Sequence, residues 1–161
     1  MQLNFIGNSN VLSSSGKTLP VLDPSDGQAF DELQRSNAQD IDAAVRAARD
    51  CFDNTWHKVS AAERGRLMMK LSQKIAAHTD ELALLEQRDC GKPVKQARAD
   101  ALALVRYFEF YAGACDKLHG ETIPYQDGYS VFTWREPHGV TGHVIPWNYP
   151  MQIFGRSVGG A

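Results

Sequence analysis

The chain has 161 residues, 43% of them hydrophobic, and 17 Lys and Arg against 19 Asp and Glu, a composition typical of globular domains. A net charge of −2 argues against a dedicated binder of nucleic acid, and no apolar run approaches the roughly 18 residues of a membrane span. Residues 1–10 lack the features of a signal peptide and the three cysteines have no paired spacing, so we expect a cytoplasmic protein without nucleic-acid or membrane partners.

Short strands are predicted over the first 35 residues. Turn-forming clusters at 7–10, 13–16 and 23–27 separate brief apolar runs. The run at 18–22 contains a Pro, which is typical of an edge strand. These intervals favour antiparallel strands joined by tight turns.

Four helices are predicted in the middle of the chain. The first two begin at 36–39 and 60–63, where an oxygen side chain is followed three residues later by Gln or Glu, the spacing of a capping box. Thr79 opens the third helix, which Gly91 ends. The fourth is closed by Gly120 and carries a wide apolar stripe, made of Ala97, Ala101, Leu104, Val105, Phe108, Tyr111, Ala112, Cys115 and Leu118.

Two strands and a helix start are predicted near the end of the chain. Apolar patterning over 129–135 and 140–145 predicts the strands, and Pro150 suits the first position of a helix. The glycines in 155–160 lack the spacing of a phosphate-binding loop and favour close packing instead. Strand, break and helix together predict an α/β fold, and because the sequence stops within an element, we expect part of a larger domain.

Most reactive side chains carry no clear functional pattern. Cys51 and Cys115 fall on apolar helix stripes, and Cys90 ends a helix, where the dipole raises the pKa of a thiol. No histidine pair has the spacing of a zinc site, so we predict no metal site. A set of cationic residues is interpreted as a solvated face, made of Arg88, Lys92, Lys95 and Arg98.

Asn148 is the candidate for a catalytic residue. It stands between Pro146 and Pro150, which restrict its backbone, at the carboxyl end of a predicted strand. Ligands of open α/β sheets bind at that edge, and a carboxamide N–H can stabilise an oxyanion. The alternative is that Asn148 caps the following helix. The residues alone leave both interpretations open.

The segment 144–150, Val-Ile-Pro-Trp-Asn-Tyr-Pro, resembles the I-x-P-W-N-[FY]-P signature of the NAD(P)-dependent aldehyde dehydrogenase superfamily. Four further segments match that family in order. They are 21–27 at an early turn, 62–66 at a helix start, 91–93 at a helix end, and 135–140, which reads REPHGV. Together the matches span nearly the whole chain.

The resemblance implies a fold and a reaction. Residues 1–161 would be the N-terminal portion of a Rossmann-type NAD(P)-binding domain, short strands plus four helices, without the catalytic domain. About 129–136 would be one arm of a hairpin used in forming a homo-oligomer. In the family a cysteine thiolate attacks an aldehyde, the thiohemiacetal gives a hydride to NAD or NADP, and a Glu-activated water releases the carboxylic acid.

The resemblance also implies site residues. Asn148 would be the oxyanion donor. Four residues would lie beside the nicotinamide half of the cofactor: Val144, Ile145, Pro146 and Trp147. Three would face the substrate tunnel at the helical spacing i, i+4, i+7: Tyr149, Ile153 and Arg156.

Arg156 suggests a substrate class. Many family members have an aromatic residue there, whereas some that act on semialdehydes with a terminal carboxylate have Arg. Because a guanidinium binds a carboxylate bidentately, we expect an aldehyde substrate that carries an anionic group. The alternative is that Arg156 pairs with an acidic side chain outside this chain.

The family's nucleophilic Cys and general-base Glu match no residue of this chain. We therefore expect the 161 residues alone to be inactive, although the complete form would be an aldehyde dehydrogenase. The alternative is a non-catalytic short protein that binds a partner subunit by strand addition. A stand-alone nucleotide-binding module ranks lowest, because no phosphate-binding fingerprint is present.

Overall fold

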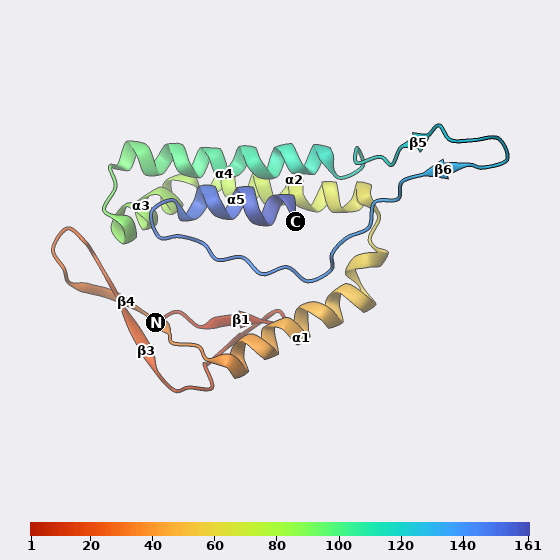
Figure 1. The fold of residues 1–161 in the computed structure, drawn as a ribbon. Helices are drawn as coiled ribbons and strands as arrows, with labels where there is room; N and C mark the ends of the chain where they lie inside the picture. Colours follow the sequence, from red (N-terminus) through yellow and green to blue (C-terminus); the bar gives the residue numbers. More distant parts are fainter.

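The computed structural model describes all residues, 1–161, as hairpins, helices and one long extended segment (Figure 1). The strands are β1 (Asn4–Ile6), β2 (Ser9–Val11), β3 (Thr18–Leu22), β4 (Ala29–Gln34), β5 (Thr122–Ile123) and β6 (Val131–Phe132). The helices are α1 (Ala38–Asn54), α2 (Ala61–Ala77), α3 (Thr79–Cys90), α4 (Val94–Ala114) and α5 (Pro150–Gly160), with a 3₁₀ turn η1 (Trp56–Lys58) after α1.

The six strands form three separate antiparallel hairpins, β1–β2, β3–β4 and β5–β6. In β3 the predicted edge residue Pro20 lies opposite Glu32 of β4. One isolated parallel bridge joins Gln2 to Leu33. The predicted antiparallel strands of the first 35 residues are therefore confirmed.

The N-terminus of α1 is capped one residue later than predicted. Asn37, not Ser36, is the N-cap, and Asp40 completes the capping box. The Asp40 carboxylate also accepts hydrogen bonds from the Ser13 hydroxyl at 2.7 Å and the Ser14 N–H at 2.8 Å. These contacts to a distant turn select the Asn37 and Asp40 pair, and local spacing could not show them.

Helices α2, α3, α4 and α5 pack together around α4 (Figure 1). Ile75, Leu104 and Phe108 form the buried centre. Gly155 lets α5 approach α4 closely, because a Cβ there would lie 2.9 Å from the Leu104 Cδ1 atom. A Cβ at Gly159 would lie equally close to the ring of Tyr111 in α4. The predicted packing role of the glycines is confirmed.

The strand prediction for 140–145 is wrong. These residues are extended, but no segment of the chain lies beside them to form ladder hydrogen bonds. The predicted strand at 129–135 shortens to β6, since β5 offers it only a two-residue partner. The prediction that Leu118 belongs to the apolar stripe of the fourth helix is also wrong, because α4 ends at Ala114.

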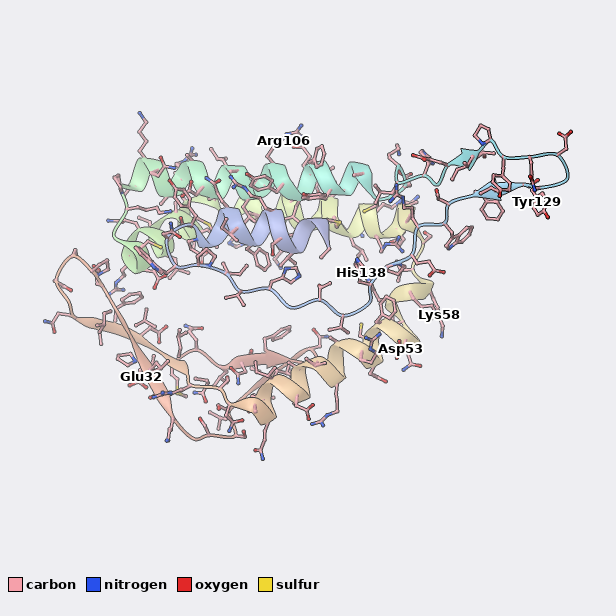
Figure 2. The ribbon with its side chains drawn as sticks, viewed as in Figure 1. Glu32, Asp53, Lys58, Arg106, Tyr129 and His138 are labelled. Atoms are coloured by element: carbon pink, nitrogen blue, oxygen red, sulfur yellow. The ribbon has the colours of Figure 1, made fainter.

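The β5–β6 hairpin projects away from the helices (Figure 1). Figure 2 shows Tyr129 at its outer end. A separate group contains β1 to β4 and α1, in which β1 contacts α1. None of the five helices combines the length and the apolar character that a bilayer crossing requires.

Candidate active site

Asn148 lies in a turn at the end of the extended segment, two residues before α5. Tyr149 is the N-cap of that helix, and it makes no side-chain capping bond. The alternative that Asn148 caps α5 is therefore wrong. Pro150 at the first helical position fixes where the helix begins. The Asn148 side chain is exposed and forms no hydrogen bond within the chain, so its carboxamide N–H groups are free to donate to a ligand.

A hollow of about 520 Å³ opens beside Asn148. Its lining consists of Gln96, Pro146, Asn148, Tyr149, Gln152, Ile153 and Arg156. The structure thus brings the three predicted tunnel residues together with the predicted oxyanion donor. Gln96 and Gln152 were missed by sequence reasoning. The spacing of Gln152, four residues before Arg156 on one helix, is the signal that could have found it.

Of the four predicted cofactor residues, Pro146 lines this hollow. Val144, Ile145 and Trp147 lie outside it. Val144 is 97% exposed and Trp147 is 76% exposed. Residues 144–147 form no hydrogen bond with another backbone group, and their one hydrogen bond to a side chain comes from the Cys90 thiol, which donates to the Trp147 carbonyl at 2.9 Å. Free backbone N–H and C=O groups beside an exposed indole suit an amide-bearing ring such as nicotinamide.

Arg156 forms no ion pair with any carboxylate of the chain. Its Nε donates to the Tyr107 hydroxyl at 2.7 Å, and its Nη2 donates to the Gln152 Oε1 at 2.7 Å. The guanidinium carbon also lies 5.4 Å from the centroid of the Tyr107 ring. These neutral partners orient the cation at the wall of the hollow without neutralising it.

A buried ionic cluster lies behind the hollow. The Lys92 ammonium donates to the Glu86 Oε1 at 2.5 Å and to the Asp100 Oδ2 at 2.7 Å. Asp100 is 0% exposed, and the Lys92 side chain is also mostly buried. The interpretation of Lys92 as part of a solvated face is therefore wrong. Its partners stand six residues earlier and eight later on different helices, so only the packing of α3 on α4 reveals them.

The cluster is electrostatically matched. Burial alone would raise the pKa of Asp100, but hydrogen bonds from Lys92, Gln152 and Gln96 outweigh it and hold the pKa below its ordinary value. Burial likewise opposes the charge of Lys92, yet bonds to Asp100 and Glu86 raise the pKa of the ammonium. For Glu86 burial prevails and raises the pKa, and its Oε2 has no hydrogen-bond partner. Lys92 and Asp100 form the charged pair.

Two contacts join this cluster to the extended segment. The Lys92 Nζ lies 4.2 Å from the centroid of the Tyr149 ring, within the range of a cation–π interaction. Cys90 is next in chain to the turn that carries Lys92, and its thiol holds the Trp147 carbonyl. Asn148 lies between these two anchored residues, so its backbone is positioned from the end of α3 and from the turn between α3 and α4.

The three cysteines lie in different surroundings, and none of them lines the hollow. Burial, aided by the Asp89 carboxylate, raises the pKa of Cys90, so the predicted direction is confirmed although burial is the leading cause. Cys115 packs against Met68 as predicted. Cys51 is exposed, contrary to prediction, because no element covers its side of α1. No group of three or more potential metal-ligating side chains converges in the chain.

The comparisons identify relatives of this arrangement. The sequence model of the "Aldehyde dehydrogenase family" matches residues 11–161. "Aldehyde dehydrogenase family 2 member B4, mitochondrial" of Arabidopsis thaliana is 44% identical over 98% of this chain. A Burkholderia cenocepacia protein described as an aldehyde dehydrogenase is 63% identical, with a TM-score of 0.95 over 98% of this chain. PnpE, known from Pseudomonas sp. WBC-3, was solved with nicotinamide adenine dinucleotide and has a TM-score of 0.94, at 33% identity over 98% of this chain.

The chain spans about a third of the length of these relatives. It covers 30% of the Arabidopsis protein, 33% of the Burkholderia chain and 32% of the PnpE chain. The fold prediction is confirmed over this shared region, and so is the family resemblance. The roles of the individual site residues stay predictions.

Proposed function

We propose that this chain, which belongs to the aldehyde dehydrogenase family, provides the oxyanion donor and part of the substrate wall of an enzyme that oxidises an aldehyde to a carboxylic acid with NAD(P)⁺. The observation that carries the proposal is the unpartnered Asn148 carboxamide at the edge of the hollow. The full-length enzyme is the protein in which this chain is joined to the part that its longer relatives have in addition.

The chemistry of this chain is electrostatic. When a nucleophile adds to an aldehyde, negative charge develops on the carbonyl oxygen. An Asn148 N–H held in place by the anchored residues on either side can donate to that oxygen without reorganisation. No cysteine of the chain lines the hollow, so the nucleophile has to come from the rest of the enzyme. The 161 residues alone are expected to be inactive.

The cofactor residues of the proposal are Val144, Ile145, Pro146 and Trp147. The backbone N–H and C=O groups of these residues that have no hydrogen-bond partner would hold the nicotinamide carboxamide beside the hollow. NAD(P)⁺ supplies the hydride acceptor when it is bound. PnpE, a relative of this chain, was solved with nicotinamide adenine dinucleotide, which supports NAD as a cofactor of the complete enzyme.

Substitution of Asn148 tests the proposed activity. In the full-length enzyme, Asn148→Ala is expected to lower kcat for aldehyde oxidation by about 10²–10³-fold with little change in KM, because the lost bond forms only as the oxyanion develops. Asn10→Ala, an exposed substitution on β2, is the control and should leave kcat unchanged. An unaltered kcat in Asn148→Ala would reject the role of oxyanion donor.

The substrate is proposed to be an aldehyde that carries a carboxylate. Arg156 supports this, since it faces the same hollow as Asn148 and is bound only by neutral groups. In the full-length enzyme, Arg156→Leu should lower kcat/KM about 10²-fold for a semialdehyde but not for a neutral aldehyde of equal length, because a charge-assisted pair is lost. An equal loss on both substrates would instead mean that Arg156 is structural.

We also propose that the complete form is a homo-oligomer, with the β5–β6 hairpin in the subunit interface. The hairpin supports this proposal because its aromatic side chains are exposed and it projects away from the helices (Figure 1). Exposed aromatic side chains that gather on one segment are typical of an association site.

A further inference from the structure

A continuous line of hydrogen bonds leads from the buried ionic cluster to the wall of the hollow. The Gln152 Nε2 donates to the Asp100 Oδ1 at 2.6 Å. On the other side of the same amide, Oε1 accepts from the Arg156 Nη2 at 2.7 Å. Gln152 therefore touches both the buried carboxylate and the cation proposed to bind the substrate's anionic group.

The orientation of the Gln152 amide is fixed at both ends. The ionised Asp100 carboxylate can only accept hydrogen bonds, so it requires the amide nitrogen. The Arg156 guanidinium can only donate, so it requires the amide oxygen. A flipped amide would place oxygen against carboxylate and nitrogen against guanidinium, and both bonds would be lost.

The buried end of this line of hydrogen bonds, at Asp100, is held by several contacts. Asp100 is fully buried and is also held by the Lys92 ammonium at 2.7 Å. Arg156 is held again on its far side by the Tyr107 hydroxyl. Two neutral acceptors thus set the position of the guanidinium, while its Nη1 forms no bond within the chain and remains available.

We propose that Gln152 is a specificity-positioning residue: it transmits the fixed position of the buried Asp100 carboxylate to Arg156 and so holds the guanidinium ready for the carboxylate of the aldehyde substrate. This inference rests on the proposed function and extends it, because preorganisation of the cation reduces the entropy lost when the anionic substrate binds.

Gln96 provides a matched control for a purely structural role. Its Nε2 donates to the same Asp100 Oδ1, at 2.9 Å, and its side chain lines the same hollow. It forms no hydrogen bond with Arg156. A substitution of Gln96 therefore removes one hydrogen bond from Asp100 without breaking the line to the guanidinium.

The test compares kcat/KM for a semialdehyde with kcat/KM for a neutral aldehyde of equal length, in the full-length enzyme. Gln152→Met is expected to lower the ratio of the two values about tenfold, mainly through KM for the semialdehyde, because a bond to a charged group is lost. Gln96→Met should leave the ratio within about twofold. General damage to folding lowers both values together and leaves the ratio unchanged.

A double-mutant cycle separates this inference from the function on which it rests. With Arg156→Leu already in place, Gln152→Met should change the ratio no further, since the residue through which it acts is gone. If Arg156→Leu lowers the ratio and Gln152→Met does not, the positioning role is overturned while the proposed substrate class stands. If Arg156→Leu itself leaves the ratio unchanged, both are overturned.

Discussion

Lys92 is the cation on which the buried polar contacts of this chain converge. Its ammonium binds two carboxylates from α3 and α4 and lies against the Tyr149 ring beside Asn148. Lys92→Met is expected to destabilise the full-length enzyme by about 3–5 kcal/mol, because Asp100 would remain buried without a cation. The free energy of unfolding in urea measures this. Lys95→Met, an exposed control three residues away, should change it by less than about 0.5 kcal/mol.

Glu86 makes stability depend on pH in a defined direction. Burial raises the pKa of Glu86 above its ordinary value of 4.5, so folding favours the protonated form. Its contribution to stability is complete below pH 4.5 and is lost as the pH rises through the folded-state pKa. Glu86→Gln, neutral at every pH, should gain stability relative to the natural protein as the pH increases. A difference in unfolding free energy that does not vary with pH would contradict this.

At the scale of elements, Gly91 is the residue that local sequence rules identify most securely. It ends α3 with a φ of 70°, and its N–H donates to the Gln87 carbonyl at 2.8 Å. A Cβ there would also lie 2.7 Å from the Pro24 Cγ. Gly91→Ala should therefore destabilise by at least about 1–2 kcal/mol, measured as unfolding free energy. Gly113→Ala in α4, where a Cβ meets nothing, should stabilise by about 0.5–1 kcal/mol.

The helices could be predicted because their signals are local. Ser60 caps α2 and Gly91 ends α3 at the expected positions, since capping depends on residues within one turn. The strand at 140–145 could not be judged locally, because a strand exists only where a partner backbone lies beside it. Cys51 was misjudged for a similar reason: periodicity shows which side of a helix is apolar but not whether anything covers it.

The candidate site divides in the same way. Asn148, Tyr149, Ile153 and Arg156 lie within nine residues, so motif and helical spacing brought them together before any fold was known. The buried cluster behind them joins Lys92 and Asp100 to a residue on α5, 52 positions beyond Asp100. Only the packing of α5 against α4 creates that contact, so no local pattern could predict it.

On the scale of the whole molecule, many large apolar side chains are exposed. On the β5–β6 hairpin and just after it, Phe132 is 67% exposed and Trp134 is 77% exposed. In the full-length enzyme, the double substitution Phe132→Glu and Trp134→Glu should dissociate the oligomer, because charged residues oppose burial of this surface. Light scattering would then measure a lower molecular mass for the particle in solution. Phe5→Glu, at an equally exposed aromatic on β1, is the control and should leave the mass unchanged.

The hollow beside Asn148 is proposed to receive the aldehyde, with the anionic end of the substrate at Arg156. A crystal structure of the full-length enzyme soaked with a semialdehyde tests it most directly. We expect the carbonyl oxygen within about 2.7–3.2 Å of the Asn148 carboxamide nitrogen, and the carboxylate within the same range of the Arg156 guanidinium. A substrate bound elsewhere, or bound here with its carboxylate away from Arg156, would contradict the account.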